Sequence, residues 1–310
     1  MIPWFHQHQY QEWAEREGEL WGESKGAVRL SWFDSPLIGR HLNRLVTGHP
    51  FRDWLDHVQE TCFPHPAALG LNVGCGHGEL ERLILERNIA DVMHGFDISA
   101  KAIESAREQA ERTGYAKQAQ YFVADANFLE RSELRGPYEV VFASMALHHF
   151  VHLEKCLDAL KTLLQPGGML IANEFIGPDR FQWTDAQLDL VNRLLQALPL
   201  ELRKNLREAG KYKERVEKPS LHYMQKHFAF EAVCSERIVP ALEERFEIVE
   251  TRPYGGTLLH LLFEAIMGNF EEERNREHAA LVQSAITLET AMLDYGVLQH
   301  DHALLICRKT

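Results

Sequence analysis

The sequence predicts an α/β protein built on a doubly wound, mostly parallel β-sheet. From Leu69 onward, short apolar runs alternate with stretches of helical periodicity, a pattern typical of parallel strands connected by helices. The first apolar run leads into a glycine-rich turn and then directly into a helical pattern. Functional residues of such sheets gather beyond the carboxyl ends of the strands, so we expect the site in the segments that follow the apolar runs.

The composition limits the classes of protein to which the chain can belong. Its 310 residues are 45% hydrophobic, enough for one large core or for one core with a cap. The formal charge of -12 argues against a nonspecific nucleic-acid-binding protein, which needs a basic face. The five cysteines are scattered without a CxxC pair, and neither a secretory leader nor an apolar run of about 18 residues is visible. We therefore expect a reduced, cytoplasmic protein with no membrane contact and no nucleic-acid partner.

Residues 1–66 precede the alternating pattern and are rich in tryptophan and histidine. Helical patterns, separated by glycine and proline, cover about residues 3–18, 35–46 and 50–62. We interpret this segment as an N-terminal helical extension or lid. It either only packs on the core or also presents an aromatic face, such as that of Trp21 or Trp32, to a cationic ligand. It could also pack on a neighbouring subunit, so the pattern is compatible with a homo-oligomer.

The glycine-rich turn lies in the sequence LGLNVGCGHGEL, from Leu69 to Leu80. We expect a strand over residues 69–73 and a helix over residues 78–87, with the glycines between them. Glycine there lets the main chain come close to a ligand. A dinucleotide-binding turn would space its glycines as GxGxxG, and a Walker loop would end in Gly-Lys-Ser/Thr, where this chain has Glu79, whose carboxylate repels phosphate. The turn therefore predicts a nucleotide-like ligand that is not rich in phosphate.

Polar residues follow the second and third of the expected strands. The second strand ends at Asp97, about 20 residues past the turn, where a carboxylate can accept both hydroxyls of an adenosine ribose. Asp97 could instead cap the helix that follows, a role that Ser99 can also fill. The third strand ends at Asp125, which taken alone could be a simple turn residue. The elements expected after the turn are strands over residues 91–96, 119–124, 138–143 and 168–174, and helices over about 99–113 and 151–164.

Together these residues resemble the class I S-adenosylmethionine (SAM)-dependent methyltransferases. The turn GCGHG is similar to motif I of that family, with Asn72 in place of the usual acidic residue. The resemblance implies SAM as the cofactor and S-adenosylhomocysteine as the product, with Asp125 at the exocyclic amine of adenine and the backbone of Ala126 at the ring. The residues that it implies at the cofactor are Asn72, Gly74, Cys75, Gly76, Gly78, Asp97, Ile98, Asp125, Ala126 and Ser144.

The resemblance also implies how the rest of the chain is organised. Residues 67–178 would form the SAM-binding Rossmann-like core, and residues 179–242, which include the helical segment expected over 202–218, an inserted helical cap. Residues 243–310 would hold the last strands of the sheet with helices between them. The segments FEIVETRPYGG and HALLICRK are expected to be two antiparallel strands that complete a seven-stranded sheet.

Candidates for catalysis follow the last strands. The motif ALHHF brings two histidines to the end of the fourth strand, and because adjacent side chains diverge on a strand or helix, we expect at most one to face the substrate. The carboxylate that ends the fifth strand either accepts a proton from the acceptor or pairs with Arg180. A tyrosine and a histidine near the two glycines after the sixth strand are weaker candidates. The candidate catalytic residues are His148, Glu174, Tyr254 and His260.

The reaction implied by the resemblance is transfer of the SAM methyl group to an oxygen, nitrogen or carbon atom of an acceptor. The acidic composition and the size of the cap favour a small or medium-sized acceptor, such as a sugar or a natural-product intermediate. No metal is expected, because His148, His149 and His152 have no carboxylate of known geometry nearby. Two other interpretations compete, namely a nicotinamide-dependent oxidoreductase and a noncatalytic interaction module that keeps the SAM fold. The first does not fit the glycine spacing, and the second has no need of the intact glycines and strand-end acids.

Overall fold

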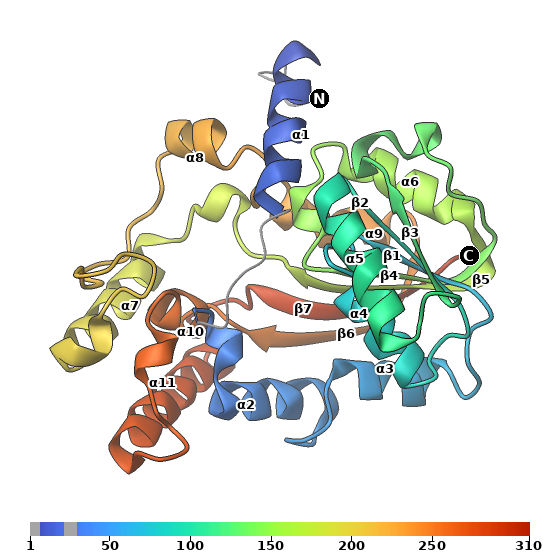
Figure 1. The fold of residues 1–310 in the computed structure, drawn as a ribbon. Helices are drawn as coiled ribbons and strands as arrows, with labels where there is room; N and C mark the ends of the chain where they lie inside the picture. Colours follow the sequence, from blue (N-terminus) through green and yellow to red (C-terminus); the bar gives the residue numbers. More distant parts are fainter. Residues whose placement is uncertain (1–6, 22–29) are drawn as a thin grey trace.

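A seven-stranded sheet forms the centre of the computed structural model, which describes residues 7–21 and 30–310 (Figure 1). The strand order is β3-β2-β1-β4-β5-β7-β6. Strand β7 is antiparallel to its neighbours β5 and β6, and the other neighbouring strands are parallel. The predicted doubly wound, mostly parallel sheet of seven strands is therefore confirmed. The strands are β1 (Gly70–Val73), β2 (Met93–Asp97), β3 (Ala119–Val123), β4 (Tyr138–Ser144), β5 (Leu164–Phe175), β6 (Glu247–Gly255) and β7 (His302–Arg308).

Helices cover both faces of the sheet and form a separate core on each. Consecutive strand residues point to opposite faces, so the middle of β4 contributes Val140 and Phe142 to one core and Val141 and Ala143 to the other. Helices α2, α3, α4 and α5 belong to the first core, and α6 and α9 belong to the second. Their bounds are α2 (Pro36–Thr47), α3 (Trp54–Cys62), α4 (Glu79–Glu86), α5 (Ala100–Thr113), α6 (Leu153–Leu163) and α9 (Ile238–Glu243).

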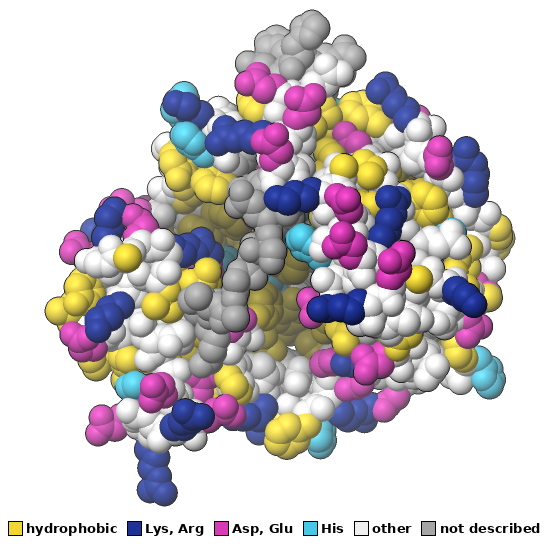
Figure 2. Space-filling view, in the orientation of Figure 1, with side chains coloured by type: hydrophobic (Ala, Val, Ile, Leu, Met, Phe, Trp, Pro, Cys, Tyr) yellow, Lys and Arg dark blue, Asp and Glu magenta, His cyan; other side chains and the backbone are white. Residues whose placement is uncertain are grey.

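A further group of helices lies beyond the carboxyl ends of the parallel strands (Figure 1). It comprises α1 (Gln7–Trp21), α7 (Asp185–Ala197), α8 (Leu221–His227), α10 (Leu259–Phe263) and α11 (Arg276–Asp294). The surface is hollowed between these helices and the sheet (Figure 2). The division of the chain into an extension, a core and a cap stays a prediction. Among the described helices, none has the length and apolar character needed to cross a membrane.

The expectation of a helix over residues 202–218 is wrong. Beyond a short 3-10 turn at Leu200–Arg203, the chain is irregular as far as α8. Tertiary contacts explain the difference, because the ammonium of Lys213 donates hydrogen bonds to the carbonyl groups of Leu261, Leu262 and Glu264 at the end of α10. These carbonyls have no partner within their own helix, so Lys213 satisfies them from a distant part of the chain.

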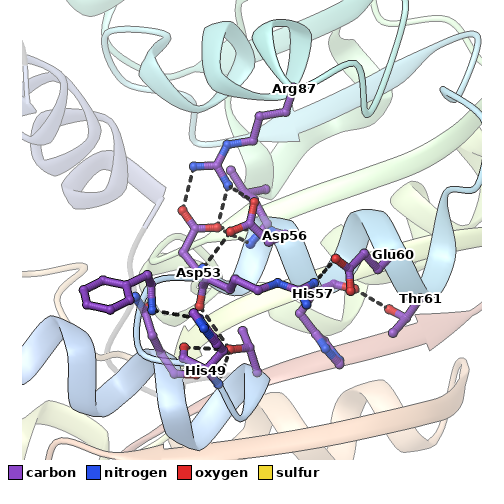
Figure 3. A network of polar contacts seen from close by, with 12 residues as sticks. His49, Asp53, Asp56, His57, Glu60, Thr61 and Arg87 are labelled. Carbon is purple, nitrogen blue, oxygen red and sulfur yellow. Dashed lines mark hydrogen bonds and ion pairs between the residues drawn. The ribbon is translucent and has the colours of Figure 1, made fainter.

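An ion-pair network fixes the N-terminal helices to the core (Figure 3). Asp53 caps α3, where its Oδ1 accepts from the backbone N–H groups of Leu55 and Asp56. Arg87, at the end of α4, donates from Nη1 and Nη2 to the two carboxylate oxygens of Asp53, over 2.5 and 2.6 Å. Two parallel bonds of this kind define the orientation as well as the distance. The network therefore holds α3 against α4, the helix that follows the glycine turn.

Glu81 of α4 is fully buried beneath the glycine turn, where a charged side chain is unusual. The side chains of Asn72 and Cys75 lie beside its carboxyl group, and Oδ1 of Asn72 is buried without a hydrogen-bond donor among the residues described. The carboxyl group fits because β2 has glycine at position 95, where a Cβ would lie 2.1 Å from Glu81 Oε1. Burial raises the pKa of Glu81 to about 7, and a proton on this carboxyl supplies the missing donor.

We expect this group to make the fold less stable as the pH rises. The unfolded chain releases the Glu81 proton near pH 4.5, but the folded chain keeps it up to about pH 7. This contribution to the free energy of unfolding, about 3 kcal/mol, is complete below pH 4.5 and is lost as the pH rises through about 7. Glu81→Gln cannot ionise, so its free energy of unfolding in urea should exceed that of the wild type by more at about pH 8 than at about pH 5.

Glu86→Gln is the matched control, because Glu86 is exposed on the same helix and should show no such pH dependence. An equal difference between Glu81→Gln and the wild type at both pH values would contradict the assignment of a protonated Glu81.

Candidate functional site

The glycine turn folds back against the neighbouring strand ends. Gly74 and Gly76 have φ values of +65° and +51°, a region that favours glycine. A Cβ on Gly74 would also lie 2.9 Å from that of Ala146. The backbone N–H of Cys75 donates to the carbonyl of Phe96, and that of Gly76 donates to Oδ2 of Asp97 over 2.9 Å. These hydrogen bonds attach the glycine turn to the end of β2.

Asp97 connects this turn to the next helix. Its Oδ1 accepts from the backbone N–H of Ser99 over 2.8 Å, and its Oδ2 accepts from Gly76. Ser99 is the N-cap of α5, where its Oγ accepts from Ala102, so the interpretation of Asp97 as the cap is wrong. The Asp97 side chain is buried, and this burial raises its pKa.

A pocket of about 550 Å³ lies beyond the carboxyl ends of β1, β2 and β4. Seven of the residues predicted at the cofactor line it, namely Gly74, Cys75, Gly76, Asp97, Ile98, Asp125 and Ala126. Three do not, and each is used structurally. Asn72 is buried within β1, Gly78 caps α4 with a φ of +72°, and Ser144 lies near Asn173 on the neighbouring strand. The binding roles of all ten stay predictions.

Helix α1 supplies a wall of the pocket near Asp125. The hydroxyl of Tyr10 donates to Oδ2 of Asp125 over 2.7 Å and accepts from the side-chain amide of Asn127. Glu17, which follows Tyr10 on α1, also lines the pocket. Tyr10 could not be predicted from the sequence, because no local pattern connects it to a residue that is 115 positions away.

The tryptophans proposed as aromatic faces are not found in the pocket wall. Trp32 is buried against the rings of Phe33 and His302 and does not line the pocket, so its predicted contact with a cationic ligand is not formed there. The side chain of Trp21 lies outside the described part of the chain.

Glu174, at the end of β5, organises the chain that follows β4. Its Oε1 accepts from the backbone N–H groups of Ala146 and Leu147, and its Oε2 is bonded to Nδ1 of His148, each over 2.8 Å. The expected alternative pair with Arg180 is not formed, because the Arg180 guanidinium donates to the carbonyls of Phe228 and Glu231. Burial opposes a charge on His148, but the hydrogen bond and the negative charge of Glu174 outweigh it and raise the pKa of this imidazole.

The two adjacent histidines face the same side, contrary to the expectation that they diverge. Their ring centroids are 4.1 Å apart, and both rings lie beside Glu231. Nε2 of His148 is 3.7 Å from one Glu231 oxygen, and Nδ1 of His149 is 3.9 Å from the other. The reason is local geometry, because Met145 has a φ of +52° and residues Leu147–His149 form a short 3-10 turn, not a strand or α-helix. These three side chains are a group that could hold a metal ion.

Tyr254 and His260, like His148 and Glu174, are not among the residues that line the pocket. The hydroxyl of Tyr254 donates to Oδ1 of Asn173 over 2.8 Å, within the buried region between β5 and β6. His260 packs against the rings of Trp32 and Trp183, and burial lowers its pKa to about 4. A catalytic role for either residue stays a prediction, as do those of His148 and Glu174.

Comparison with known proteins identifies the same part of the chain. A family model described as a methyltransferase domain matches residues 71–170, from β1 into β5. Malonyl-[acyl-carrier protein] O-methyltransferase of Magnetococcus marinus is 30% identical over 161 residues, 52% of this chain and 57% of that protein. Demethylmenaquinone methyltransferase of Thermus thermophilus is 27% identical over 139 residues, 45% of this chain and 61% of that protein. The similarity thus spans less than two thirds of either relative.

Among solved structures, that of the [4+2]-cyclase SpnF is similar with a TM-score of 0.50, covering 97% of this chain and 94% of that chain at 15% identity. This likeness concerns the fold alone, and a shared fold does not determine a reaction. The strand order, the glycine turn and the matched domain together show that the chain contains a methyltransferase domain, over residues 71–170, and has the fold of the class I S-adenosylmethionine-dependent methyltransferases.

Proposed function

We propose that the chain transfers the methyl group of SAM to an oxygen, nitrogen or carbon nucleophile of a small or medium-sized acceptor. The observation that carries the proposal is the convergence of the glycine turn, Asp97 and Asp125 on one pocket. Bound SAM supplies a methyl group on a positively charged sulfur, and the electrons of the broken bond stay on the sulfur as the acceptor takes the methyl group.

The residues at the cofactor end of the pocket fit SAM. Each oxygen of Asp97 accepts one backbone N–H group and keeps a second lone pair, with which the carboxylate can accept a ribose hydroxyl. Oδ1 of Asp125 already accepts from the backbone and side-chain N–H groups of Asn127, so Oδ2 keeps one lone pair beside its bond to Tyr10 for the adenine amine. Glu17 and Glu79 add negative charge around the pocket, which favours a sulfonium and disfavours phosphate.

We place the acceptor at the other end, beside Met145 and His149, which line the pocket. The chain contributes mainly alignment, since holding two reactants as near-attack neighbours lowers the barrier by several kcal/mol. Where the nucleophile carries a proton, Nε2 of His148 is the proposed proton acceptor, because Nδ1 is already bonded to Glu174. Glu174 then acts as a positioning residue, since both of its oxygens have partners.

The relatives support methyl transfer without identifying the acceptor. One is named for O-methylation of malonyl-[acyl-carrier protein] and the other for demethylmenaquinone. Each matches about half of this chain, and the matched family model covers residues 71–170, which contain the cofactor residues and not the helices around the acceptor end. The acceptor class proposed here, a sugar or natural-product intermediate, therefore rests on the pocket volume of about 550 Å³ and on the acidic composition.

The decisive experiment needs no knowledge of the acceptor. Freshly purified protein is denatured, the released small molecules are identified by mass spectrometry, and the folded protein is titrated with SAM and S-adenosylhomocysteine in a calorimeter. We expect binding in the micromolar range, and a second released molecule would become the leading acceptor. A folded chain that binds neither compound would overturn the proposal in favour of a noncatalytic interaction module. Enhanced NADH fluorescence on mixing would favour the oxidoreductase instead.

Replacing Asp97 should weaken the cofactor complex. Asp97→Ala removes the proposed ribose acceptor and the partner of Gly76, so we expect at least tenfold weaker binding of S-adenosylhomocysteine by calorimetry. Asp91→Ala, an exposed change just before the same strand, is the control and should bind as the wild type does. Unchanged affinity of a folded Asp97→Ala protein would remove the ribose role.

Replacing the residues at the acceptor end should slow methyl transfer more than it weakens cofactor binding. Once an acceptor is identified, we expect His148→Ala to lower the single-turnover rate by about 100-fold, with little change in the affinity for S-adenosylhomocysteine. Glu174→Ala should also lower the rate because it releases the imidazole, and His65→Ala, an exposed change, should leave the rate unchanged. If both His148→Ala and Glu174→Ala keep the full rate, proton transfer through this pair is wrong.

A further inference from the structure

We propose that His148, His149 and Glu231 bind a divalent transition-metal ion at the acceptor end of the pocket. One ligand atom from each residue lies within 4.8 Å of the other two. The two oxygens of Glu231 face one ring nitrogen each, over 3.7 and 3.9 Å, which is too long for hydrogen bonds. Ligand atoms around one ion, with bonds of about 2.1 Å, stand roughly 3 to 4 Å apart. The separations therefore suit a shared ion better than direct contact.

The types of donor indicate which ions the group would take. Two imidazole nitrogens and one carboxylate suit Zn²⁺, Fe²⁺ or Co²⁺, whereas Mg²⁺ and Ca²⁺ prefer oxygen ligands alone. Three protein ligands leave at least one coordination position open, as in catalytic metal sites. His149 lines the pocket, so an open position would be reachable from the acceptor end.

Glu174 provides the supporting contact that metal-binding histidines ordinarily have. Its Oε2 is 2.8 Å from Nδ1 of His148 and accepts the proton carried there, which leaves the lone pair of Nε2 directed at Glu231. Glu174 is itself oriented by the backbone N–H groups of Ala146 and Leu147. Such a carboxylate sets the ring orientation and raises the basicity of the ligand nitrogen.

Hydrogen bonds from other parts of the chain also hold the segment that carries Glu231 in place. Arg180 donates from Nη1 to the carbonyls of Phe228 and Glu231, and its backbone N–H donates to Ala232 over 2.6 Å. The backbone N–H of Val233 donates to the carbonyl of His148 over 2.8 Å. Arg180 and Ala232 have φ values of +56° and +45°, unfavourable conformations that such contacts can maintain. A main-chain hydrogen bond thus joins the segment of the third ligand, Glu231, to that of the first, His148.

The ion would change how the acceptor loses its proton, and this consequence rests on the proposed function. Coordination lowers the pKa of a bound hydroxyl, so the O–H bond breaks with release of the proton to solvent. The oxygen then forms its bond to the methyl carbon as the sulfur–methyl bond breaks, and the electrons of that bond stay on the sulfur. His148 would then serve as a ligand of the ion and would no longer need to take the proton itself.

The test uses the whole chain and no acceptor. Protein treated with a chelator and then freed of it is titrated with Zn²⁺ by calorimetry, and with Co²⁺ while its visible absorption is recorded. We expect one high-affinity ion per chain and a Co²⁺ spectrum typical of four- or five-coordinate nitrogen and oxygen ligands. Glu231→Gln and His149→Ala should each weaken Zn²⁺ binding at least tenfold, and Glu174→Gln by about 10- to 100-fold.

Matched controls separate this site from binding by other histidines. Glu236→Gln, an exposed change five residues along the same segment, should bind Zn²⁺ as the wild type does. Unfolding temperatures and S-adenosylhomocysteine affinity are measured on every variant. Zn²⁺ affinity that neither Glu231→Gln nor His149→Ala reduces would overturn the proposal, as would a wild type that takes up no high-affinity ion.

The two proposals fail in different ways. Binding of S-adenosylhomocysteine without any high-affinity ion would remove the metal site and leave the methyltransferase function standing. Loss of activity on chelation, restored by Zn²⁺ or Fe²⁺ in the wild type but not in Glu231→Gln, would support the metal site once an acceptor is known.

Discussion

The buried carboxylate of Glu174 is the interaction on which the candidate site depends. It takes the backbone N–H groups of Ala146 and Leu147 and the imidazole of His148, and so turns the chain sharply after β4. That turn brings Met145 and Ala146 to the pocket wall. Removing the carboxylate would leave buried donors without partners, each at a cost of about 1 to 3 kcal/mol. One side chain on β5 thus sets both the cofactor pocket and the pair of histidines beside it.

The charges around the pocket match a positively charged ligand. Glu17, Glu79, Asp97 and Asp125 all contribute to its lining, and Arg82 is the basic residue there among those described. A sulfonium is stabilised in such a field, and a diphosphate is repelled. The same acidic residues position the protein's own groups, since Asp97 holds the glycine turn and Asp125 accepts from Tyr10. The carboxylates that we propose at the cofactor therefore also support the fold around the pocket.

The helices beyond the carboxyl edge are connected to one another by polar contacts over long sequence distances. Lys213 satisfies carbonyl groups at the end of α10, and Glu289 of α11 accepts from the backbone N–H groups of Gly256 and Leu258 before α10 begins. A five-residue helix has too few internal bonds to be stable alone, so these two side chains stabilise its ends. They keep α10 in position between the segments that carry Lys213 and Glu289.

The sequence alone determined the features that depend on adjacent residues. Alternating apolar runs predicted the strands, and the glycines predicted the turn, because side-chain direction and backbone freedom are local properties. Asp97 and Asp125 were found because they follow strands directly. Only the tertiary structure decided which distant segments meet: Tyr10 with Asp125, Lys213 with the end of α10, and Glu231 with two histidines expected to diverge. No local pattern encodes such contacts, since they depend on how whole elements pack around the sheet.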